Sequence, residues 1–509
     1  MTSGHARAVA AGSLGVAAAL AVGELAAGLV AAVPSPLDAV GQLVVSGLSG
    51  PVLSWAIETF GSANRLVLTG GTVVIALGIG AVLGLLARGG LAVPGMVFAG
   101  FGIVGSLASL SQPGATAAFV VLTMIASVTV GILVLTRLLA VAEPDGGRPT
   151  DDGMPRRGFL MLAAATASVS VVAVALGRYA LGGRAVLVDL DDLVLPSPAV
   201  ARPPVSASQD LSTVVDGVSP VLTPTDGFFR IDTAIAVPRV DPETWQLRVH
   251  GLVDRELVLT YDQLRDLPMR EVDATISCVS NEVGGDLIGT ARWLGTPLAG
   301  VLERAGIGAG AEQVVGRSVD GWTSGFPIEA VTDGRDSLVA IGMNGDPLPA
   351  RHGFPARLIV PGLYGYVSAT KWLSEIELTT WEGFDAYWVP RGWAKRGPVK
   401  TSSRIDVPRR GATVEAGEVV VAGVAWAPTR GIERVEVQVD DGSFVAAELT
   451  PPLSEEAWVQ WRAVVALEPG SRRLRVRATD GTGQTQSDRP RPPAPDGAEG
   501  WHAIRVEVR

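Results

Sequence analysis

MNGDPLPARHGFPARLIVPGLYGYVSATKWL, at residues 343–373, is the most distinctive stretch of this sequence. Its glycines and prolines restrict the backbone, and they hold His352, Arg357 and Lys371 within one run of loops. Fixed loops with convergent cationic donors are suited to a phosphate or pyrophosphate group. The alternative is a solvated loop with structural prolines, and the stretch alone leaves both interpretations open.

Cys278, the only cysteine, lies in a second such stretch, EVDATISCVSNEVGGDLIGTARWLG at residues 271–295. It follows a strand-like run and precedes a glycine-rich polar turn. We therefore expect it to lie at the opening of a site rather than in an apolar core. A thiolate in that setting suits a soft metal, whereas the alternative is a small buried hydrophobic residue. With one cysteine, this chain can build no intrachain disulfide and no multi-cysteine zinc or iron–sulfur site.

The composition divides the chain near residue 186. The 509 residues are 48% hydrophobic, with a mean hydropathy of +0.34, which is too apolar for an ordinary soluble protein. The apolar excess lies in the first third, while the remainder has the mixed charge of a soluble protein. The net charge of −10 argues against a nucleic-acid-binding surface.

Five apolar stretches in the first third are close to the ~20 residues that cross hydrocarbon, and they predict a five-helix transmembrane bundle. They are about 8–33, 66–87, 91–110, 115–136 and 159–177. Glu24, in the first stretch, is either a functional intramembrane carboxylate or a neutral packing residue near a helix end. The stretch 37–60 is also apolar, but Pro51 breaks it, and we place it at the membrane interface.

The arginines predict the orientation in the cell membrane. With five spans, Arg65 is misplaced, but the arginines that flank the other helix ends on the cytoplasmic side are Arg7, Arg88, Arg137, Arg156 and Arg157. Everything after the fifth span then lies outside the cytoplasm. Arg156 and Arg157 precede the fifth span in PRRGFLMLAAATASVSVVAVALG (155–177), which is typical of a twin-arginine export signal. A plain positive-inside anchor is the alternative. A twin-arginine route carries folded proteins, as a cofactor inserted in the cytoplasm requires.

Three parts are predicted to follow the membrane region of residues 1–181. Residues 182–222 form a proline-containing linker. Residues 223–398 mix strand-like with helix-like segments, such as TPLAGVLERAG (296–306), in an irregular order that predicts an α+β domain. Residues 399–509 contain only short strands separated by Gly, Pro and Asp, which is typical of an immunoglobulin-like β-sandwich.

Several spaced motifs together resemble the sulfite oxidase family of molybdenum enzymes, in a membrane-anchored bacterial form, over about residues 223–509. In order, they are FFRIDT (228–233), ISC-x-x-N-E (276–282), ARWLGTPLAGVL (291–302), MNGDPLPARHGFPARLIVPGLYG (343–365), ATKWL (369–373) and VKTSSRIDVP (399–408). The resemblance implies a molybdenum-molybdopterin cofactor held between strands and loops of the α+β domain. It also implies two-electron oxygen-atom transfer on a small sulfur compound.

The resemblance also implies roles for individual residues. Cys278 matches the cysteine that ligates molybdenum, and Tyr387 matches a tyrosine that points toward the metal, so we expect both to be catalytic. Asp232 and Thr233 stand where relatives have an Asn-His pair. The other expected cofactor contacts match family positions around the pterin and its phosphate: His352, Arg357, Ser368 and Lys371.

One departure from the family puts the substrate in doubt. Sulfite oxidases carry an arginine soon after the metal cysteine, whereas this chain has Asn281-Glu282-Val283, and a carboxylate there would repel sulfite. Arg230 or Arg292 is the candidate replacement. Oxidation of a small sulfur compound, reduction of an S-oxide, and a non-catalytic membrane-tethered binding protein therefore stay open.

The five spans contain no histidine, so they lack a residue expected to ligate haem. We therefore expect the membrane part to be an anchor and a separate electron-transfer protein to exchange electrons with the catalytic domain. Since the terminal sandwich of the family often pairs two subunits, a homodimer is a further expectation.

Overall fold

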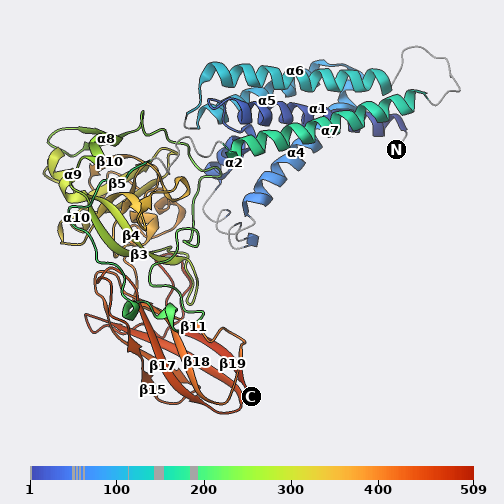
Figure 1. The fold of residues 1–509 in the computed structure, drawn as a ribbon. Coiled ribbons are helices and arrows are strands. Elements are labelled where there is room, and N and C mark those ends of the chain that lie inside the picture. The colour runs from blue at the N-terminus through green and yellow to red at the C-terminus, as the bar shows by residue number, and fades with distance from the viewer. Residues whose placement is uncertain are drawn as a thin grey trace. The chain divides into compact units, whose positions relative to one another are not determined.

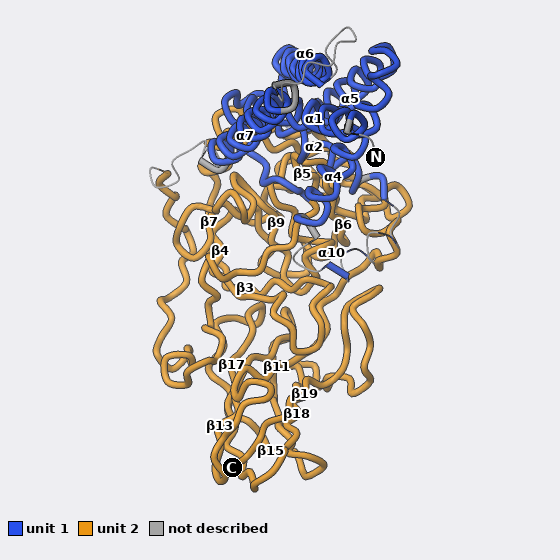
Figure 2. Tube along the Cα trace, turned by 90° about the vertical axis from the view of Figure 1, so that its right-hand side faces the viewer, with its two compact units in different colours: residues 1–187, 234–239 blue, residues 188–233, 240–509 orange. Residues whose placement is uncertain are grey.

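The structure is a computed structural model, and the residues that it describes are 3–48, 64–112, 114–142, 154–183 and 193–509, with isolated positions between residues 52 and 60. The chain forms two compact units, coloured blue and orange in Figure 2. Unit 1 comprises residues 1–187 and 234–239, and unit 2 comprises residues 188–233 and 240–509. The end of the stretch predicted at the membrane interface and the start of the predicted linker lie outside the described residues.

Unit 1 contains the five long helices that the sequence predicts as spans (Figure 1). They are α1 (Ser3–Leu29), α4 (Asn64–Leu86), α5 (Ala92–Leu110), α6 (Ala117–Ala142) and α7 (Met154–Gly183). Each is long and apolar enough to cross a membrane, as the sequence predicts, while their insertion as a transmembrane bundle stays a prediction. The helix α2 (Pro36–Gly47) has 12 residues, and at about 1.5 Å per residue it is shorter than the hydrocarbon core.

The helix α1 contacts α4, α6 and α7. Glycines bring these helices into backbone contact, since a Cβ on Gly84 would lie 1.9 Å from the carbonyl oxygen of Ala8. A Cβ on Gly177 would likewise lie 2.3 Å from the carbonyl oxygen of Glu24. No larger side chain fits at either place, so small residues allow the close packing.

Glu24 is fully buried, and its carboxylate is engaged on several sides. Its Oε2 atom lies 2.8 Å from Nε of Arg178 on α7. The hydroxyl of Ser35 and the backbone N–H of Leu37 donate to its Oε1 atom, at 2.8 and 3.1 Å. Arg178 also pairs with Asp38 on α2 at 2.9 Å. Glu24 is therefore a structural ion-pair partner that ties α1 to α2 and α7, rather than a neutral packing residue.

The first part of unit 2 contains two sheets, of order β3-β4-β7-β8 with β9 paired to β7, and β2-β1-β10-β5-β6. The strands are β1 (Gln246–Gly251), β2 (Leu257–Thr260), β3 (Arg270–Ser277), β4 (Ile288–Pro297), β5 (Gln313–Ser318), β6 (Thr323–Pro327), β7 (Leu338–Met343), β8 (Asp346–Pro347), β9 (Arg357–Ile359) and β10 (Leu373–Thr379). Short helices alternate irregularly with them: α8 (Tyr261–Arg265), α9 (Leu298–Ala305), α10 (Glu329–Thr332) and α11 (Gly365–Ser368). This arrangement confirms the predicted α+β class.

The second part of unit 2, which we call the C-terminal sandwich, consists of two facing sheets of order β11-β13-β17-β16 and β12-β19-β18-β14-β15. Its strands are β11 (Ser402–Val407), β12 (Thr413–Val414), β13 (Gly417–Trp426), β14 (Ile432–Val439), β15 (Phe444–Ala446), β16 (Glu448–Leu449), β17 (Val459–Leu467), β18 (Gly470–Asp480) and β19 (His502–Val508). Buried side chains of both sheets, among them Trp461, Val435 and Val506, form one core.

The two parts of unit 2 are hydrogen-bonded along β3, the edge strand of its sheet. The hydroxyl of Ser454 donates to the carbonyl of Asp273 at 2.6 Å. The N–H of Thr275 donates to the carbonyl of Glu456 at 3.0 Å, and the N–H of Trp458 donates to the Thr275 hydroxyl at 2.7 Å. These bonds satisfy a strand edge that would otherwise be open.

Residues 193–222, predicted as part of the linker, pack along unit 2. Leu211 and Val218 share a small core with Ala422 of the C-terminal sandwich. Near β3, the N–H of Ala199 donates to the carbonyl of Met269 at 2.7 Å. The predicted domain boundaries themselves stay predictions.

Candidate functional site

Cys278 stands at the exit of β3, at the start of the loop 278–287 that leads into β4. Its backbone N–H donates to the carbonyl of Leu287 at 2.9 Å and closes the base of this loop, which we call the Cys278 loop. Inside the loop, the buried side chain of Asn281 accepts a hydrogen bond from the N–H of Leu287 at 2.9 Å. Gly284 has a φ of +80°, a conformation that glycine adopts without strain. The loop thus holds the cysteine with its own hydrogen bonds.

The side chain of Cys278 is buried, and burial raises the pKa of its thiol. A nearby metal cation would reverse this preference and stabilise the thiolate. Among the residues that the structure describes, no group of three or more His, Cys, Asp or Glu side chains is placed to hold a metal ion. An organic cofactor can supply a metal at Cys278 with ligands that the described residues do not offer as such a group.

A cluster of cations and one carboxylate comes from β9, from the segments that flank it and from residues 230–232. Arg357 of β9 is 4% exposed. Lys371, which is 12% exposed, places its ammonium 2.5 Å from the carboxylate of Asp232. Nε of Arg230 lies 3.1 Å from the same carboxylate, and His352 is buried beside them. These five residues form what we call the cationic cradle.

The cationic cradle carries more positive charge than the carboxylate of Asp232 balances. Burial lowers the pKa of Arg357 to about 10. Burial, with the charge of Arg357, lowers the pKa of Lys371 to about 8, and burial with both these cations lowers the pKa of His352 to about 4. All three shifts disfavour the cationic form, so an anion bound here would be stabilised.

Two atoms of the cationic cradle have no hydrogen-bond partner among the described residues: Nε of Arg357 and Nδ1 of His352. Nε2 of His352 lies 3.0 Å from the carbonyl oxygen of Thr225 and donates to it in the neutral ring, so Nδ1 is an acceptor. Buried polar atoms without a partner are rare in proteins. A molybdopterin fits this place, because its phosphate oxygens accept hydrogen bonds and its pterin N–H groups donate them.

Packing contacts connect the cationic cradle to the strands beside Cys278. The guanidinium of Arg357 lies 5.0 Å from the ring centre of Trp293 on β4. The indole N–H of Trp293 donates to the carbonyl of Ala274 on β3 at 3.2 Å. At the start of α11, a Cβ on Gly365 would lie 3.7 Å from the carbonyl oxygen of Ser277. Arg357 on β9 and Cys278 at the exit of β3 therefore belong to one sheet.

Ser368 and Thr233 are the remaining predicted cofactor contacts. Ser368 ends α11 and is buried, and its hydroxyl donates to the carbonyl of Tyr364 at 3.0 Å. The oxygen of that hydroxyl remains able to accept a hydrogen bond. Thr233 is half-buried and follows Asp232 of the cationic cradle. Their contact with a cofactor stays a prediction.

Tyr387, the predicted catalytic tyrosine, has a buried hydroxyl without a hydrogen-bond partner among the described residues. The guanidinium of Arg391 lies 3.7 Å from its ring centre. Burial raises the pKa of Tyr387, and the neighbouring charges that act on it are those of Arg391 and Asp320. Its role toward a metal stays a prediction.

Tyr364 lies near enough to the candidate metal ligand, Cys278, to interact with it electrostatically, and sequence reasoning missed it. Burial raises its pKa to about 12, and the charges of Asp496, Cys278 and Glu499 act in the same direction. The phenol therefore stays protonated at neutral pH. Its position in the run PGLYG (361–365), inside the most distinctive stretch of the sequence, is the signal that would have pointed to it.

The two arginines proposed as replacements for the missing family arginine have other partners. Arg292 on β4 donates through Nε and Nη2 to the carboxylate of Asp273 on β3, at 2.8 and 2.9 Å. Arg230 pairs with Asp232 in the cationic cradle. On the Cys278 loop itself, Glu282 is exposed. Arg292 is thus engaged in a cross-strand ion pair with Asp273, and its action as a replacement stays a prediction.

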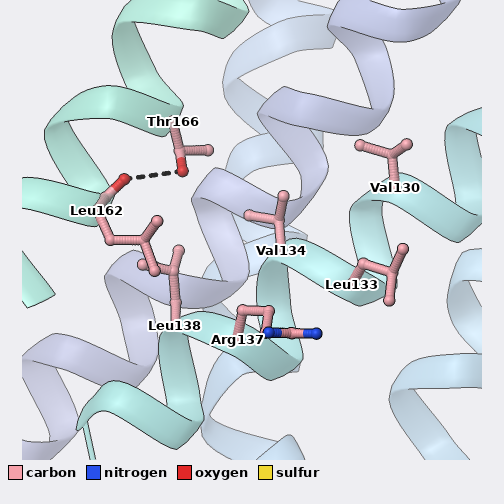
Figure 3. A pocket seen from close by; sticks show the side chains of 7 residues that line it. All are labelled: Val130, Leu133, Val134, Arg137, Leu138, Leu162 and Thr166. Atoms are coloured by element: carbon pink, nitrogen blue, oxygen red, sulfur yellow. Dashed lines mark hydrogen bonds between the residues drawn. The ribbon is translucent and has the colours of Figure 1, made fainter.

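A shallow groove of unit 1 lies between α6 and α7, where Figure 3 shows its lining. Its volume of about 200 Å³ is below the about 300–1,000 Å³ of typical small-molecule sites. Arg137 is its one ionisable side chain, and the hydroxyl of Thr166 is engaged with the carbonyl of Leu162 at 2.8 Å (Figure 3). The groove holds none of the predicted site residues.

Known proteins share the features of unit 2. Residues 234–388 match a family described as the oxidoreductase molybdopterin binding domain. The mitochondrial sulfite oxidase of Rattus norvegicus is 30% identical over 339 residues, which are 56% of this chain and 62% of that protein. The sulfite oxidase of Gallus gallus is 30% identical over 318 residues, which are 52% of this chain and 68% of that protein.

A solved structure shares the fold. The crystal structure of the sulfane dehydrogenase SoxCD from Paracoccus pantotrophus aligns with a TM-score of 0.50 at 23% identity, over 63% of this chain and 92% of that chain. The chain spans less than two thirds of the length of the rat protein.

Proposed function

Because the chain belongs to the sulfite oxidase family of molybdenum-cofactor oxidoreductases, we propose that it is a membrane-anchored enzyme that transfers an oxygen atom to or from a small sulfur compound. The observation that carries this proposal is the cationic cradle, whose cations and unpartnered polar atoms adjoin the strands that lead to and from Cys278. Buried cations in excess of their carboxylate are costly unless an anion binds beside them.

The chain's own residues bind and orient the cofactor. Arg357, Lys371 and His352 would hold its phosphate and pterin, with Asp232, Thr233 and Ser368 around them, and Cys278 would ligate the metal. When bound, the molybdenum centre supplies the two-electron redox chemistry. Tyr364 and Tyr387 keep their protons at neutral pH, since burial raises the pKa of both phenols, so each can donate a hydrogen bond to a substrate oxygen.

The charges near the Cys278 loop favour a substrate that is less anionic than sulfite. Glu282 is on the loop, and the carboxylates of Asp496 and Glu499 lie close enough to Tyr364 to raise its pKa. Lys400 offsets part of this charge, with contacts of 3.2 Å to Asp496 and 2.8 Å to Glu499. A neutral S-oxide fits this field better than a dianion does. Reduction of an S-oxide is therefore the second candidate function, and a non-catalytic binding protein is the third.

The proposed location of unit 2 is outside the cytoplasm, reached by a twin-arginine route. Support comes from the five apolar helices, the bias of arginines toward one side and the need to export a folded cofactor domain. Replacing Arg156 and Arg157 with lysines keeps the charge and should strand unit 2 inside. Normal export of that variant would leave a plain anchor as the explanation.

The partners follow from the same proposal. We infer that a separate protein exchanges electrons with the site, since the five long helices contain no histidine to ligate haem beyond His5, near the start of α1. The two facing sheets of the C-terminal sandwich, with four and five strands, support the immunoglobulin-like type, and this part is the proposed surface for pairing of two subunits.

One experiment tests the proposed function. Full-length protein purified from membranes is analysed for molybdenum and pterin, and is then assayed with sulfite and with dimethyl sulfoxide and methionine sulfoxide. The expected result is one molybdenum and one pterin per chain, with turnover of at least one of these compounds. Cofactor without turnover would favour the binding-protein alternative, and protein free of both would overturn the proposal.

A further inference from the structure

The outer face of the Cys278 loop is covered by the C-terminal sandwich. Two side chains of the sandwich reach the loop, Arg404 from β11 and His502 from β19. Both are buried, at 9% and 7% exposed. The loop carries the candidate metal ligand, so these contacts join the sandwich to the site itself.

Arg404 is fixed by all three nitrogens of its guanidinium. Nη1 donates to the carbonyl of Gly285 in the Cys278 loop at 2.8 Å. Nε donates to Asp406 at 2.6 Å, and Nη2 donates to the hydroxyl of Ser219 at 2.8 Å. A guanidinium held in a rigid fork fixes the position of the carbonyl that it binds. Because Asp406 balances its charge, the contact adds little net charge to the site.

His502 packs directly on the turn of the Cys278 loop. A Cβ on Gly284 would lie 2.2 Å from Cδ2 of the His502 ring, so the ring occupies the space that any side chain there would need. The ring is oriented by the backbone N–H of Ile405, which donates to its Nδ1 atom at 3.0 Å. Its position is thus set by β11, the strand that carries Arg404.

The strand that ends at Cys278 is held from the same direction. Thr275, three residues before the cysteine, exchanges hydrogen bonds with Glu456 and Trp458 of the C-terminal sandwich. The sandwich therefore contacts both the strand before the cysteine and the loop after it. The backbone on both sides of Cys278 is therefore held by the sandwich.

We propose that Arg404 and His502 are positioning residues for Cys278, and that the C-terminal sandwich thereby sets the direction in which the cysteine sulfur meets the metal. The sandwich is then a part of the redox site as well as a surface for pairing. This inference rests on the proposed function, because it assigns Cys278 to the metal.

The first test uses the reactivity of Cys278 toward iodoacetamide in full-length protein purified with its cofactor. As the only cysteine, it is the sole source of thiol label, and a metal-bound sulfur is protected from alkylation. Arg404→Leu should increase the labelling rate by about tenfold or more, in line with the effect of losing an outer-shell partner. Arg404→Lys should restore part of the protection, because one donor remains for Gly285.

The matched control is Arg462→Leu. Arg462 lies on β17 of the same sheet as β11, pairs with Glu448 at 2.8 Å and is half-exposed. This variant removes an arginine and an ion pair from the sandwich without touching the Cys278 loop, so its labelling rate should equal that of the wild type. X-ray absorption at the metal adds a second measurement, since the number of sulfur ligands should fall in Arg404→Leu alone.

The second test changes the contact on the side of the Cys278 loop. It can be used even if the Arg404→Leu protein does not fold. Gly284→Ala places a methyl group on the His502 ring and should also expose the cysteine. Gly310→Ala carries a similar backbone strain, with φ of +84°, but a Cβ there meets nothing within 4 Å. Adding His502→Ala to Gly284→Ala should recover part of the protection by removing the clash.

The outcomes separate the two ideas. If Arg404→Leu and Gly284→Ala both keep the wild-type labelling rate and sulfur count, the sandwich does not position the cysteine and the inference is wrong. If the wild-type protein binds molybdenum and pterin but labels freely, Cys278 is not the metal ligand, and the inference fails with that assignment. If the wild-type protein binds no molybdenum, the proposed function fails first.

Discussion

Two buried clusters of acids and bases stand in different parts of this molecule, and they differ in how well they are satisfied. In unit 1, Glu24 and Asp38 share Arg178, and Ser35 and Leu37 supply the remaining donors to Glu24. In unit 2, the cations of the cationic cradle outnumber their single carboxylate, and two polar atoms have no partner among the described residues.

The difference distinguishes a structural cluster from a binding site. A cluster that completes its own hydrogen bonds has nothing left to offer a ligand, and its loss destabilises the fold. A cluster with excess charge and unpartnered atoms is costly in isolation, and an anionic ligand offsets that cost. In the sequence, both clusters are no more than separate charged residues. The neighbouring charges and hydrogen-bond partners in the folded chain show which cluster is structural and which is a binding site.

The largest expected effect is that of Cys278→Ser. A serine oxygen is a harder and weaker donor than a thiolate, so oxygen transfer should be lost by more than the about 10- to 100-fold that an outer-shell change costs. Pterin binding should persist, because the cationic cradle is untouched. Turnover is measured beside bound molybdenum and pterin. Normal activity of the variant would reduce Cys278 to a packing residue.

The next prediction compares the two clusters directly through Arg357→Leu and Arg178→Leu. Arg357→Leu should weaken pterin binding by about 1.5–3 kcal/mol, the value of a charge-assisted hydrogen bond, with little loss of stability in the cofactor-free protein. Arg178→Leu should instead destabilise the fold by about 3–5 kcal/mol, because it leaves the carboxylate of Glu24 buried without a counter-ion. Pterin content and the midpoint of thermal unfolding in detergent are measured for both.

The reverse pattern would contradict the comparison. If Arg178→Leu lowers the pterin content of otherwise stable protein, or if Arg357→Leu destabilises the cofactor-free fold strongly, the distinction between a structural cluster and a binding cluster is wrong. Glu24→Gln is the control in unit 1, because it removes the charge that Arg178 balances and should cost less than the loss of Arg178 itself.

A third prediction uses the pKa of Lys371, which burial lowers to about 8 in the cofactor-free protein. The protonated amine binds an anion, so affinity for the cofactor should fall as pH rises through about 8, by up to about tenfold per pH unit. For the cofactor-free fold the sign is opposite. The unfolded amine keeps its proton to about pH 10.4, so the lowered pKa costs stability below about pH 8, and that cost disappears as pH rises toward 10.4.

Pterin release during gel filtration at a series of pH values measures the first part. Lys371→Arg is the control, since a guanidinium keeps its charge over this range and should remove the pH dependence. An unchanged pH profile in that variant would show that another group titrates.

The sequence predicted much of this molecule, and the misses have physical causes. The five apolar helices were predictable because lipid demands long apolar runs. Three residues of the cationic cradle, His352, Arg357 and Lys371, were predictable because prolines and glycines hold them within one stretch. Tyr364 was missed because a tyrosine has no charge to mark it. The partners of Glu24 and Arg292 were missed because they come from segments distant in sequence or from a strand register that local patterns do not define.

The contacts of Arg404 and His502 illustrate the same limit. Both residues lie in strands whose sequence predicts only a sandwich, more than a hundred residues after the Cys278 loop. Their meeting with Gly284 and Gly285 depends on how the two parts of unit 2 pack along β3. No sequence pattern within either segment predicts how the C-terminal sandwich packs along β3.

The smallest expected effect is that of Glu282→Gln on sulfite oxidation. Glu282 is exposed on the Cys278 loop, so its repulsion of a dianion is screened and is worth about 0.2–1 kcal/mol, which is an up to about fivefold lower KM for sulfite in the variant. The KM for a neutral sulfoxide should not change, and the effect on sulfite should shrink as salt is added. Asp286→Asn, which removes another exposed charge of the same loop, tests whether the position of the charge matters or only the total charge of the loop.

If the wild-type protein already oxidises sulfite rapidly with a low KM, Glu282 does not repel the substrate. The arginine that sulfite oxidases place after the cysteine would then be replaced by a cation elsewhere, with Arg230 of the cationic cradle as the first residue to test.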